Sequence, residues 1–195
     1  MLVSRPYIEE WGESVMEKVI YIVRHCSAEG QAPDAKLTAE GVLQANKLVE
    51  FFEDIEVDRI ITSPFSRARQ TGWPIAERKK LHVEVDSRLG ERVLSSVDFK
   101  DWLIKLEDTF FNPHLKYEGG ESSSEAMSRV CDVADELGDG SRTVLVTHGN
   151  LMALLVRCYD GRFGFEHWQT LTNPDVYVVR IKDGDSEVAR IWGSH

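Results

Sequence analysis

The stretch Val19-Ile20-Tyr21-Ile22-Val23-Arg24-His25 is the most informative part of this chain, because an apolar run typical of a strand ends directly in an arginine and a histidine. The same design returns in Val144-Leu145-Val146-Thr147-His148-Gly149-Asn150. Side chains at the carboxyl ends of neighbouring parallel strands converge on one crevice of an open sheet. We therefore expect the two histidines to meet, and the arginine beside the first indicates an anionic substrate.

Periodic patterns outside these two stretches complete the fold. Strands are expected over residues 19–23, 58–62, 82–85, 142–147, 176–181 and 187–192. Helical patterns fall between most of them, and Asp183-Gly184 is a hairpin signal between the last two. Strands that alternate with helices and end in a hairpin predict a three-layer α/β/α fold with a mixed, mainly parallel central sheet.

Helix boundaries are marked by capping residues. Thr38 is the expected cap of one helix, Ser63-Pro64 the expected N-cap and first residue of a second, and Ser122 to Glu125 a capping box for a third, which ends near Gly138. A fourth helix is expected directly after the second histidine. The apolar face expected for the first helix is Val42, Ala45, Val49 and Phe52. That of the third helix is Met127, Val130, Ala134 and Leu137. That of the fourth helix is Leu151, Leu154, Leu155 and Cys158.

Length and composition indicate a single soluble domain over residues 18–195, preceded by an N-terminal extension over residues 1–17. The 195 residues are 42% hydrophobic and 29% charged, and no apolar run approaches membrane-spanning length. The extension lacks the apolar region of a secretory signal. A net charge of -10 disfavours nucleic acid and anionic membranes as partners, but a few arginines in a cleft can still attract an anion.

Cysteine usage favours a cytoplasmic protein that needs no metal or other cofactor. Cys26, Cys131 and Cys158 are an odd set without paired metal-ligand spacing, so reduced thiols are expected. The first of them stands beside cationic groups and invites a thiolate mechanism. However, the cysteine phosphatase pattern requires an arginine six positions later, where this chain has Ala32. We interpret Cys26 as a small residue next to the histidine.

The candidate site residues fit phosphoryl transfer. A neutral imidazole such as His25 can attack phosphorus and hold the phosphoryl group, while Arg24 can bind two phosphate oxygens. Arg67 lies one turn into the helix that follows the second strand, and His148 begins another helix. Two arginines and a protonatable histidine around one point form a clamp for the charge on a transferring phosphoryl group.

The leaving group of a phosphate ester needs a proton, which a carboxylic acid near the phosphate can supply. Glu91 follows the third strand and is the candidate. Glu84, Asp86 and Asp98 are alternatives that lie nearby in the sequence.

On these motifs the chain resembles the histidine phosphatase superfamily, the phosphoglycerate mutase-like family, and in particular its small phosphatases, from about Lys18 to the C-terminus. The resemblance implies the phosphoglycerate mutase-like fold, with His25 as the phosphorylated nucleophile, Glu91 as the proton donor and His148 as a further catalytic residue. The stretches that carry it are Arg24-His25-Cys26, Leu37 to Gly41 with Gln44-Ala45, Ser63 to Thr71, Leu89-Gly90-Glu91, Glu118 to Ser122 and His148-Gly149. The implied phosphate ligands are Arg24, Arg67 and Gly149.

The chain departs from the family pattern after the nucleophile. Cys26 replaces the usual glycine, and Ala28 and Gln31 replace a threonine and an asparagine. Gln31 can still donate an amide hydrogen bond to phosphate and is included among the phosphate ligands.

The resemblance implies a phosphomonoester hydrolase that acts on a small phosphorylated metabolite through a phosphohistidine. A phosphoglycerate mutase is the first alternative, disfavoured by the short chain and by the missing tryptophan-asparagine stretch of mutases. A phosphate-binding protein without turnover is the second, suggested by Cys26. The substrate and the oligomeric state are left open, and an oligomer is compatible with the sequence.

Other polar and aromatic residues are interpreted conservatively. His82, His114, His167 and His195 are taken as structural, and Arg69 as a helix-surface residue. The aromatic residues between Glu91 and Gly119 either line the substrate entrance or pack as a helix, and packing is slightly favoured; they are Trp102, Phe110, Phe111 and Tyr117.

Overall fold

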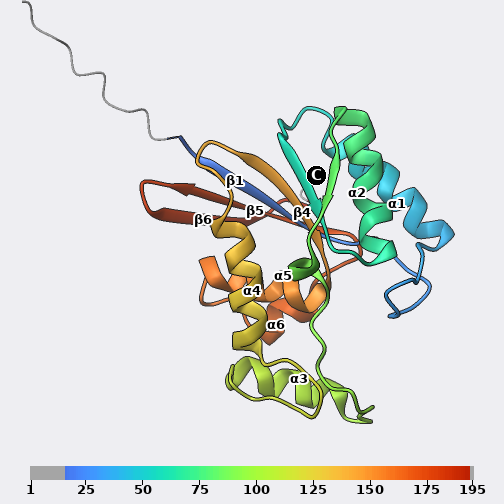
Figure 1. Cartoon of the computed structure of the whole chain (residues 1–195), viewed down its shortest axis with the longest axis vertical. Coiled ribbons are helices and arrows are strands. Elements are labelled where there is room, and N and C mark those ends of the chain that lie inside the picture. Colours follow the sequence, from blue (N-terminus) through green and yellow to red (C-terminus); the bar gives the residue numbers. More distant parts are fainter. Residues whose placement is uncertain (1–15, 194–195) are drawn as a thin grey trace, which may run out of the picture.

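A computed structural model describes residues 16–193, and within this range six strands form one sheet (Figure 1). The strands are β1 (Lys18–Arg24), β2 (Arg59–Thr62), β3 (Val83–Val85), β4 (Arg142–Thr147), β5 (Asp175–Lys182) and β6 (Asp185–Arg190). Their order across the sheet is β3-β2-β4-β1-β5-β6, with parallel pairing from β3 to β1 and antiparallel pairing at β5 and β6. The sheet is mixed and mainly parallel, as predicted.

Helices cover both faces of the sheet and complete the three-layer fold. In Figure 1, α1 and α2 lie on one side and α4, α5 and α6 on the other, with α3 beyond them. The helices are α1 (Ala39–Phe51), α2 (Ser66–Lys79), α3 (Trp102–Phe111), α4 (Ser123–Asp135), α5 (Gly149–Tyr159) and α6 (Phe165–Gln169), with a 3-10 turn, η1, at Ser87–Leu89.

The central strand β1 divides the core into two halves, because successive side chains of a strand point to opposite faces. Ile20 and Ile22 pack with residues of α4, α5 and α6. Val19, Tyr21 and Val23 pack with residues of α1 and α2. All five side chains are buried, which explains why the strand is a continuous apolar run rather than an alternating one.

Several capping and turn predictions are confirmed. The Thr38 hydroxyl accepts a hydrogen bond from Gly41 N at 3.0 Å at the start of α1. Ser122 and the Glu125 side chain form both hydrogen bonds of the capping box that begins α4. Asp183 and Gly184 join β5 and β6 with φ angles of 55° and 87°, the left-handed backbone that a tight hairpin turn requires.

Two local predictions are wrong. Helix α2 begins at Ser66 with Phe65 as its N-cap residue, not at Pro64, because the Ser63 hydroxyl accepts from Phe65 N and also bonds the ring of His148. Val42 is 52% exposed, since the buried face of α1 is centred on Ala45 and Leu48 instead.

The expectation of three reduced cysteines is also wrong. Cys131 of α4 and Cys158 of α5 form a disulfide, whereas Cys26 is free and buried. The two helices pack side by side and bring together residues that are 27 positions apart, which no local spacing rule detects. The sequence argument for a cytoplasmic location rested on reduced thiols and loses that support.

The residues at the two ends lie largely outside this description. Residues 1–15 and 194–195 are not described, so most of the expected extension and His195 lie outside the described residues. Between residues 16 and 193, no helix is both long enough and apolar enough to span a membrane.

Gly41 of α1 allows the chain that follows His25 to approach the helix. A Cβ atom built on Gly41 would lie 2.0 Å from the main-chain oxygen of Ser27. We expect Gly41→Ala to lower the free energy of unfolding by about 1–3 kcal/mol, as overpacking against backbone does, measured by urea denaturation. Gly138→Ala is the matched control, because nothing lies within 4 Å of its Cβ position. Equal effects of the two substitutions would contradict this packing argument.

Candidate active site

Parallel pairing of β1 with β4 brings His25 and His148 together. Arg24 is in register with Thr147, and His25 N donates to the Thr147 carbonyl at 3.0 Å, so the residues after both strands lie side by side. The two imidazole rings are 5.1 Å apart between centroids. Both side chains are buried, with exposed fractions of 9% for His25 and 1% for His148.

Hydrogen bonds fix the tautomer of His25. Its Nδ1 lies 2.7 Å from the Cys26 carbonyl oxygen, which can only accept, so Nδ1 carries the proton. Its Nε2 lies 3.1 Å from Nε of Arg67, which can only donate, so Nε2 keeps its lone pair. His25 therefore presents an unprotonated Nε2 directly beside a guanidinium.

Burial keeps both imidazoles neutral. Loss of solvation lowers the pKa of His25 to about 4, and the positive charges of Arg67 and Arg24 act in the same direction. Burial lowers the pKa of His148 to about 2, with His25 and the nearby arginines as further causes. A neutral imidazole is the form that can act as a nucleophile.

The two predicted arginines are held by main-chain carbonyls. Arg67 is 1% exposed and donates from Nη1 to the carbonyls of Gln31 and Ala32 at 3.1 and 2.8 Å. Arg24 donates from Nη1 to Leu171 O at 3.0 Å, while its buried Nε has no partner. No carboxylate of the described residues pairs with either guanidinium, so both keep their charge for an anion.

Gly149 and Gln31 lie close to these arginines. A Cβ atom on Gly149 would come within 3.1 Å of the Arg24 guanidinium carbon, so glycine there lets the arginine lie across the start of α5. Gln31 fixes Arg67 through its main-chain carbonyl, and the residue lines the same cavity as Arg24.

Glu91 lies at the N-terminus of α5. Its Oε2 accepts from Asn150 N at 3.1 Å, and its Oε1 accepts from Leu151 N at 3.1 Å and from Arg92 N at 2.8 Å. The start of a helix is a favourable place for a carboxylate. Glu91 therefore lies at the first turn of the helix that His148 precedes, on the wall of the cavity that Arg24 lines.

Two alternatives to Glu91 face other partners. Glu84 forms an exposed ion pair with Arg59 at 2.8 Å, and Asp86 pairs with Arg88 at 2.8 Å. Glu91 lines the cavity, whereas Glu84, Asp86 and the third alternative, Asp98, do not.

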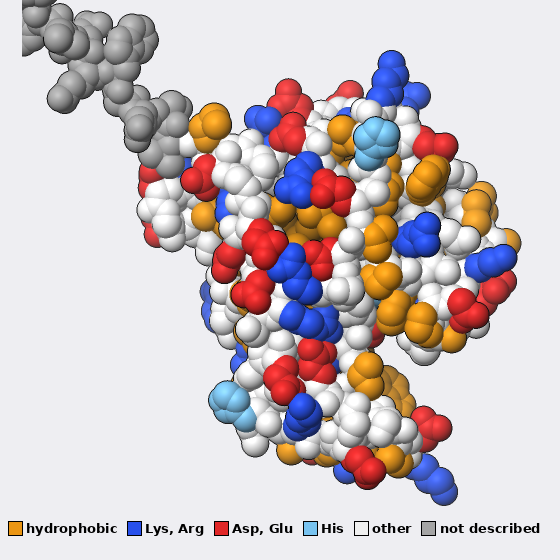
Figure 2. All heavy atoms as spheres, in the orientation of Figure 1, with side chains coloured by type: hydrophobic (Ala, Val, Ile, Leu, Met, Phe, Trp, Pro, Cys, Tyr) orange, Lys and Arg blue, Asp and Glu red, His pale blue; other side chains and the backbone are white. Residues whose placement is uncertain are grey.

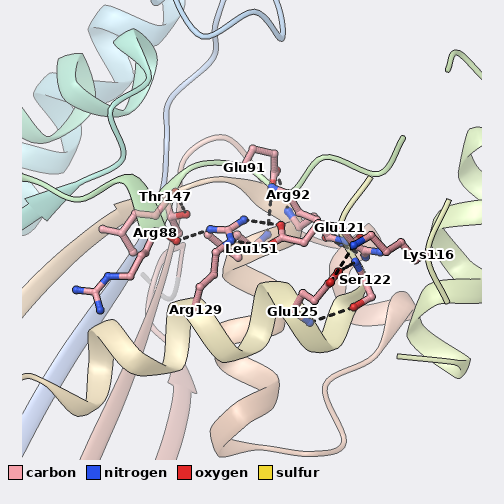
Figure 3. A network of polar contacts seen from close by, with 12 residues as sticks. Arg88, Glu91, Arg92, Lys116, Glu121, Ser122, Glu125, Arg129, Thr147 and Leu151 are labelled. Carbon is pink, nitrogen blue, oxygen red and sulfur yellow. Dashed lines mark hydrogen bonds and ion pairs between the residues drawn. The ribbon is translucent and has the colours of Figure 1, made fainter. Parts of the chain in front are cut away.

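A polar network holds the segment that carries Glu91 (Figure 3). Arg129 of α4 pairs with Glu121 at 2.6 Å and also donates to the Arg88 carbonyl, and the Thr147 hydroxyl donates to the Leu89 carbonyl at 2.8 Å. Figure 2 shows acidic and basic side chains interleaved over the middle of this face. Individual exposed pairs contribute at most about 1 kcal/mol, so the network matters chiefly because it fixes the position of Glu91.

The surroundings of Cys26 disfavour a thiolate. Its side chain is fully buried, and burial raises the pKa of its thiol to about 11. Its amide donates to the Thr71 hydroxyl at 3.0 Å, which ties the chain after His25 to α2. The structure therefore supports its interpretation as a small residue next to His25.

A cavity of about 390 Å³ is lined by four of the seven predicted site residues, but not by His25, Arg67 or His148. Arg24, Gln31, Glu91 and Gly149 were predicted; Arg92, Leu94, Trp102, Leu106, Asn150 and Trp168 line it as well. The slight preference for helix packing over a place at the substrate entrance is correct for Phe110, which is buried. It is wrong for Trp102, which is 51% exposed and lines the cavity. Across residues 16–193, no three or more His, Cys, Asp or Glu side chains are grouped so that they could hold a metal ion.

Histidines and arginines gathered at the strand ends of an α/β/α sheet define a protein built for phosphoryl transfer or phosphate binding. The sequence model of the histidine phosphatase superfamily (branch 1) matches residues 20–192. The chain belongs to this superfamily, whose members include phosphatases and phosphotransferases.

Relatives in the superfamily carry different names. A Salmonella choleraesuis protein called "probable phosphoglycerate mutase GpmB" is 30% identical over 155 residues, which are 70% of this chain and 72% of that protein. Among solved structures, a mycobacterial glucosyl-3-phosphoglycerate phosphatase is 23% identical, with a TM-score of 0.71 over 89% of this chain and 98% of that one. Bacillus stearothermophilus YhfR is 21% identical, with a TM-score of 0.73 over 89% and 96%. At these identities the two structures show the same fold.

His25 should titrate far below an ordinary histidine. In an NMR pH titration, with its ring signals identified by their loss in His25→Asn, we expect a midpoint near pH 4. In the unfolded chain the pKa of His25 is about 6.5, so as the pH falls the unfolded chain binds this proton before the folded protein does. The stability that neutral His25 contributes is therefore complete above about pH 6.5 and falls as the pH drops towards 4. Inorganic phosphate should raise the midpoint, because its negative charge favours the imidazolium. A midpoint near 6.5 in the free protein would contradict the burial argument.

Proposed function

We propose that this protein is a phosphomonoester hydrolase that acts on a small phosphorylated metabolite through a phosphohistidine at Nε2 of His25. One observation carries the proposal: the lone pair of Nε2 lies beside the Arg67 guanidinium, in a neutral and buried imidazole. A nucleophile and a charge clamp that are placed before substrate arrives meet the main requirement for phosphoryl transfer.

In the first half-reaction, Nε2 of His25 attacks phosphorus, and the bond from phosphorus to the ester oxygen breaks. Arg67 exchanges its hydrogen bond to Nε2 for one to a phosphate oxygen, and Arg24, Gln31 and Gly149 complete the phosphate site. The departing oxygen takes a proton from the Glu91 carboxyl group and leaves as an alcohol. His148 packs edge to face against the His25 ring and stabilises the transferring group.

In the second half-reaction, water attacks phosphorus of the phosphohistidine. Glu91, now a carboxylate, takes one proton of that water, and the bond from phosphorus to Nε2 breaks. Inorganic phosphate leaves, and His25 returns to its neutral form. The hydrogen bond from Nδ1 to the Cys26 carbonyl holds the ring in one orientation through both steps.

Mutase activity is the second candidate, because a relative of 30% identity is named a probable phosphoglycerate mutase. A mutase returns the phosphoryl group from histidine to a second hydroxyl instead of to water. The two functions therefore share the first half-reaction and differ in the acceptor. The proposal of a hydrolase is supported by the phosphatases among the structures of the same fold.

Hydrolysis of p-nitrophenyl phosphate tests the proposal. We expect phosphate release by the wild type, unchanged by EDTA, and a loss of at least about 10³-fold in His25→Ala, because the nucleophile is gone. Rapid quenching in alkali should trap labelled phosphohistidine on the wild type alone. His114→Ala is the matched control, since this exposed histidine lies outside the site.

Two other outcomes are informative. Interconversion of 2- and 3-phosphoglycerate without net phosphate release would establish the mutase. Tight binding of phosphate or vanadate, with no turnover of a broad panel of phosphate esters, would establish a binding protein and overturn the hydrolase.

A further inference from the structure

Helix α1 carries a large apolar side chain on its exposed side. The helix lies at the outer edge of the molecule beside α2, against which it packs (Figure 1). Gly41, Ala45 and Leu48 form its buried side. Leu43 projects to the opposite side of the helix and is 58% exposed. This leucine is therefore available to a partner at the middle of an outward-facing helix.

One flank of the exposed side of α1 is apolar. Val42 is 52% exposed, and Trp73 of α2 is 54% exposed. Both residues line a hollow of about 240 Å³ between the two helices. Isolated apolar side chains are ordinary at a protein surface, but adjoining ones mark a contact surface. We call Val42, Leu43 and Trp73 the α1–α2 patch.

The other flank of α1 carries one charge of each sign. Glu40 and Lys47 are both exposed, and two turns of helix separate them on the same side. They are about 10 Å apart along the helix axis, which is too far for them to pair with each other. Neither forms an ion pair with any other residue in the described part of the chain. This flank thus offers an acid and a base to a partner.

The two charges are complementary to those of a second copy of the same helix. When two copies pack face to face and antiparallel about a twofold axis, each flank meets the same flank of the partner, and positions equally far before and after the axis face each other. An axis that passes between Leu43 and Gln44 places Glu40 against Lys47 of the partner subunit. The same symmetry pairs Lys47 with Glu40 of the partner subunit. A parallel arrangement would instead place the charged flank against the apolar one.

Helix α3 also exposes apolar side chains but lacks this complementarity. Ile104 is 60% exposed and Phe111 is 79% exposed. The one lysine of this helix, Lys105, already pairs with Asp101 at 3.5 Å, and Asp108 is exposed between the two apolar residues. Two copies of α3 would bring acidic side chains together, which disfavours a contact between copies at this helix.

We propose that the α1–α2 patch, with Glu40 and Lys47 at its edge, is a surface through which two copies of this chain form a twofold dimer with antiparallel α1 helices. The apolar side chains supply the buried area, and the two reciprocal ion pairs fix the orientation. Because the contact involves only two helices of each copy, the dimer is weak and depends on concentration. None of these residues belongs to the proposed active site.

Sedimentation equilibrium of the full chain, between about 1 µM and 1 mM, tests for the dimer. We expect a single equilibrium between monomer and dimer. Leu43→Ser should raise the dissociation constant at least about 10-fold, because less apolar surface is buried in each half of the contact. Ile104→Ser is the matched control, since Ile104 is equally exposed but lies on α3. It should leave the dissociation constant unchanged.

Charge reversal tests the arrangement. Glu40→Lys and Lys47→Glu each create like-charge contacts at both symmetric positions, and each alone should raise the dissociation constant at least about 10-fold. The first variant makes the chain less acidic and the second more acidic, so net charge does not explain a loss in both. A mixture of the two should dimerise as the wild type does, because every contact in the mixed dimer again joins an acid and a base. Asp132→Lys on α4 is the control for Glu40→Lys and should have no effect.

Three results would overturn the proposal. The first is a wild type that is monomeric at every concentration. The second is a dimer that neither Leu43→Ser nor the two single reversals weaken, because it uses another surface. The third is a dimer that both reversals weaken but that their mixture does not restore, because the predicted antiparallel pairing is then absent. Circular dichroism confirms the fold of each variant, and all the substituted side chains are exposed.

Discussion

The site depends on the parallel pairing of β1 with β4. These neighbouring central strands are buried on both faces, so their register is fixed by apolar packing on either side. His25 and His148 follow the last paired residues, and a slip of one residue would turn one of the rings out of the crevice. Two imidazoles 5.1 Å apart are therefore positioned by two strands that are buried on both faces.

The sequence was sufficient to predict the features that depend on hydrophobic periodicity and on the order of the motifs along the chain. A continuous apolar strand that ends in a polar pair identified both histidines, and the order of the motifs identified Arg24, Arg67 and Glu91. Capping at Thr38 and Ser122 followed from local hydrogen bonding, which a short window of sequence contains. These predictions needed no knowledge of which helices become neighbours.

The features that were missed arise from contacts between distant segments. Arg92 gains its place from hydroxyls of α3 and α4 and from the Glu121 carbonyl, none of which lies near it in the sequence. The disulfide between Cys131 and Cys158 depends on the packing of α4 against α5. The start of α2 was misplaced because Ser63 bonds His148 from a different strand end. Local propensity is overridden in each case by a partner that only the fold supplies.

The distribution of charge reconciles an acidic chain with an anionic substrate. The net charge of -10 is spread over the surface, where water and salt screen it within about 10 Å. Arg24, Arg67 and Arg92 are instead withdrawn from solvent and held by neutral carbonyls and hydroxyls, so salt screens their charges less than those at the surface. Among the residues that line the cavity with Arg24 and Arg92, Glu91 is the one carboxylate, and three amides fix it at the start of α5. An anion that enters this cavity meets the buried charges of Arg24 and Arg92 and a single carboxylate, and this arrangement agrees with the two-step phosphoryl transfer that we propose.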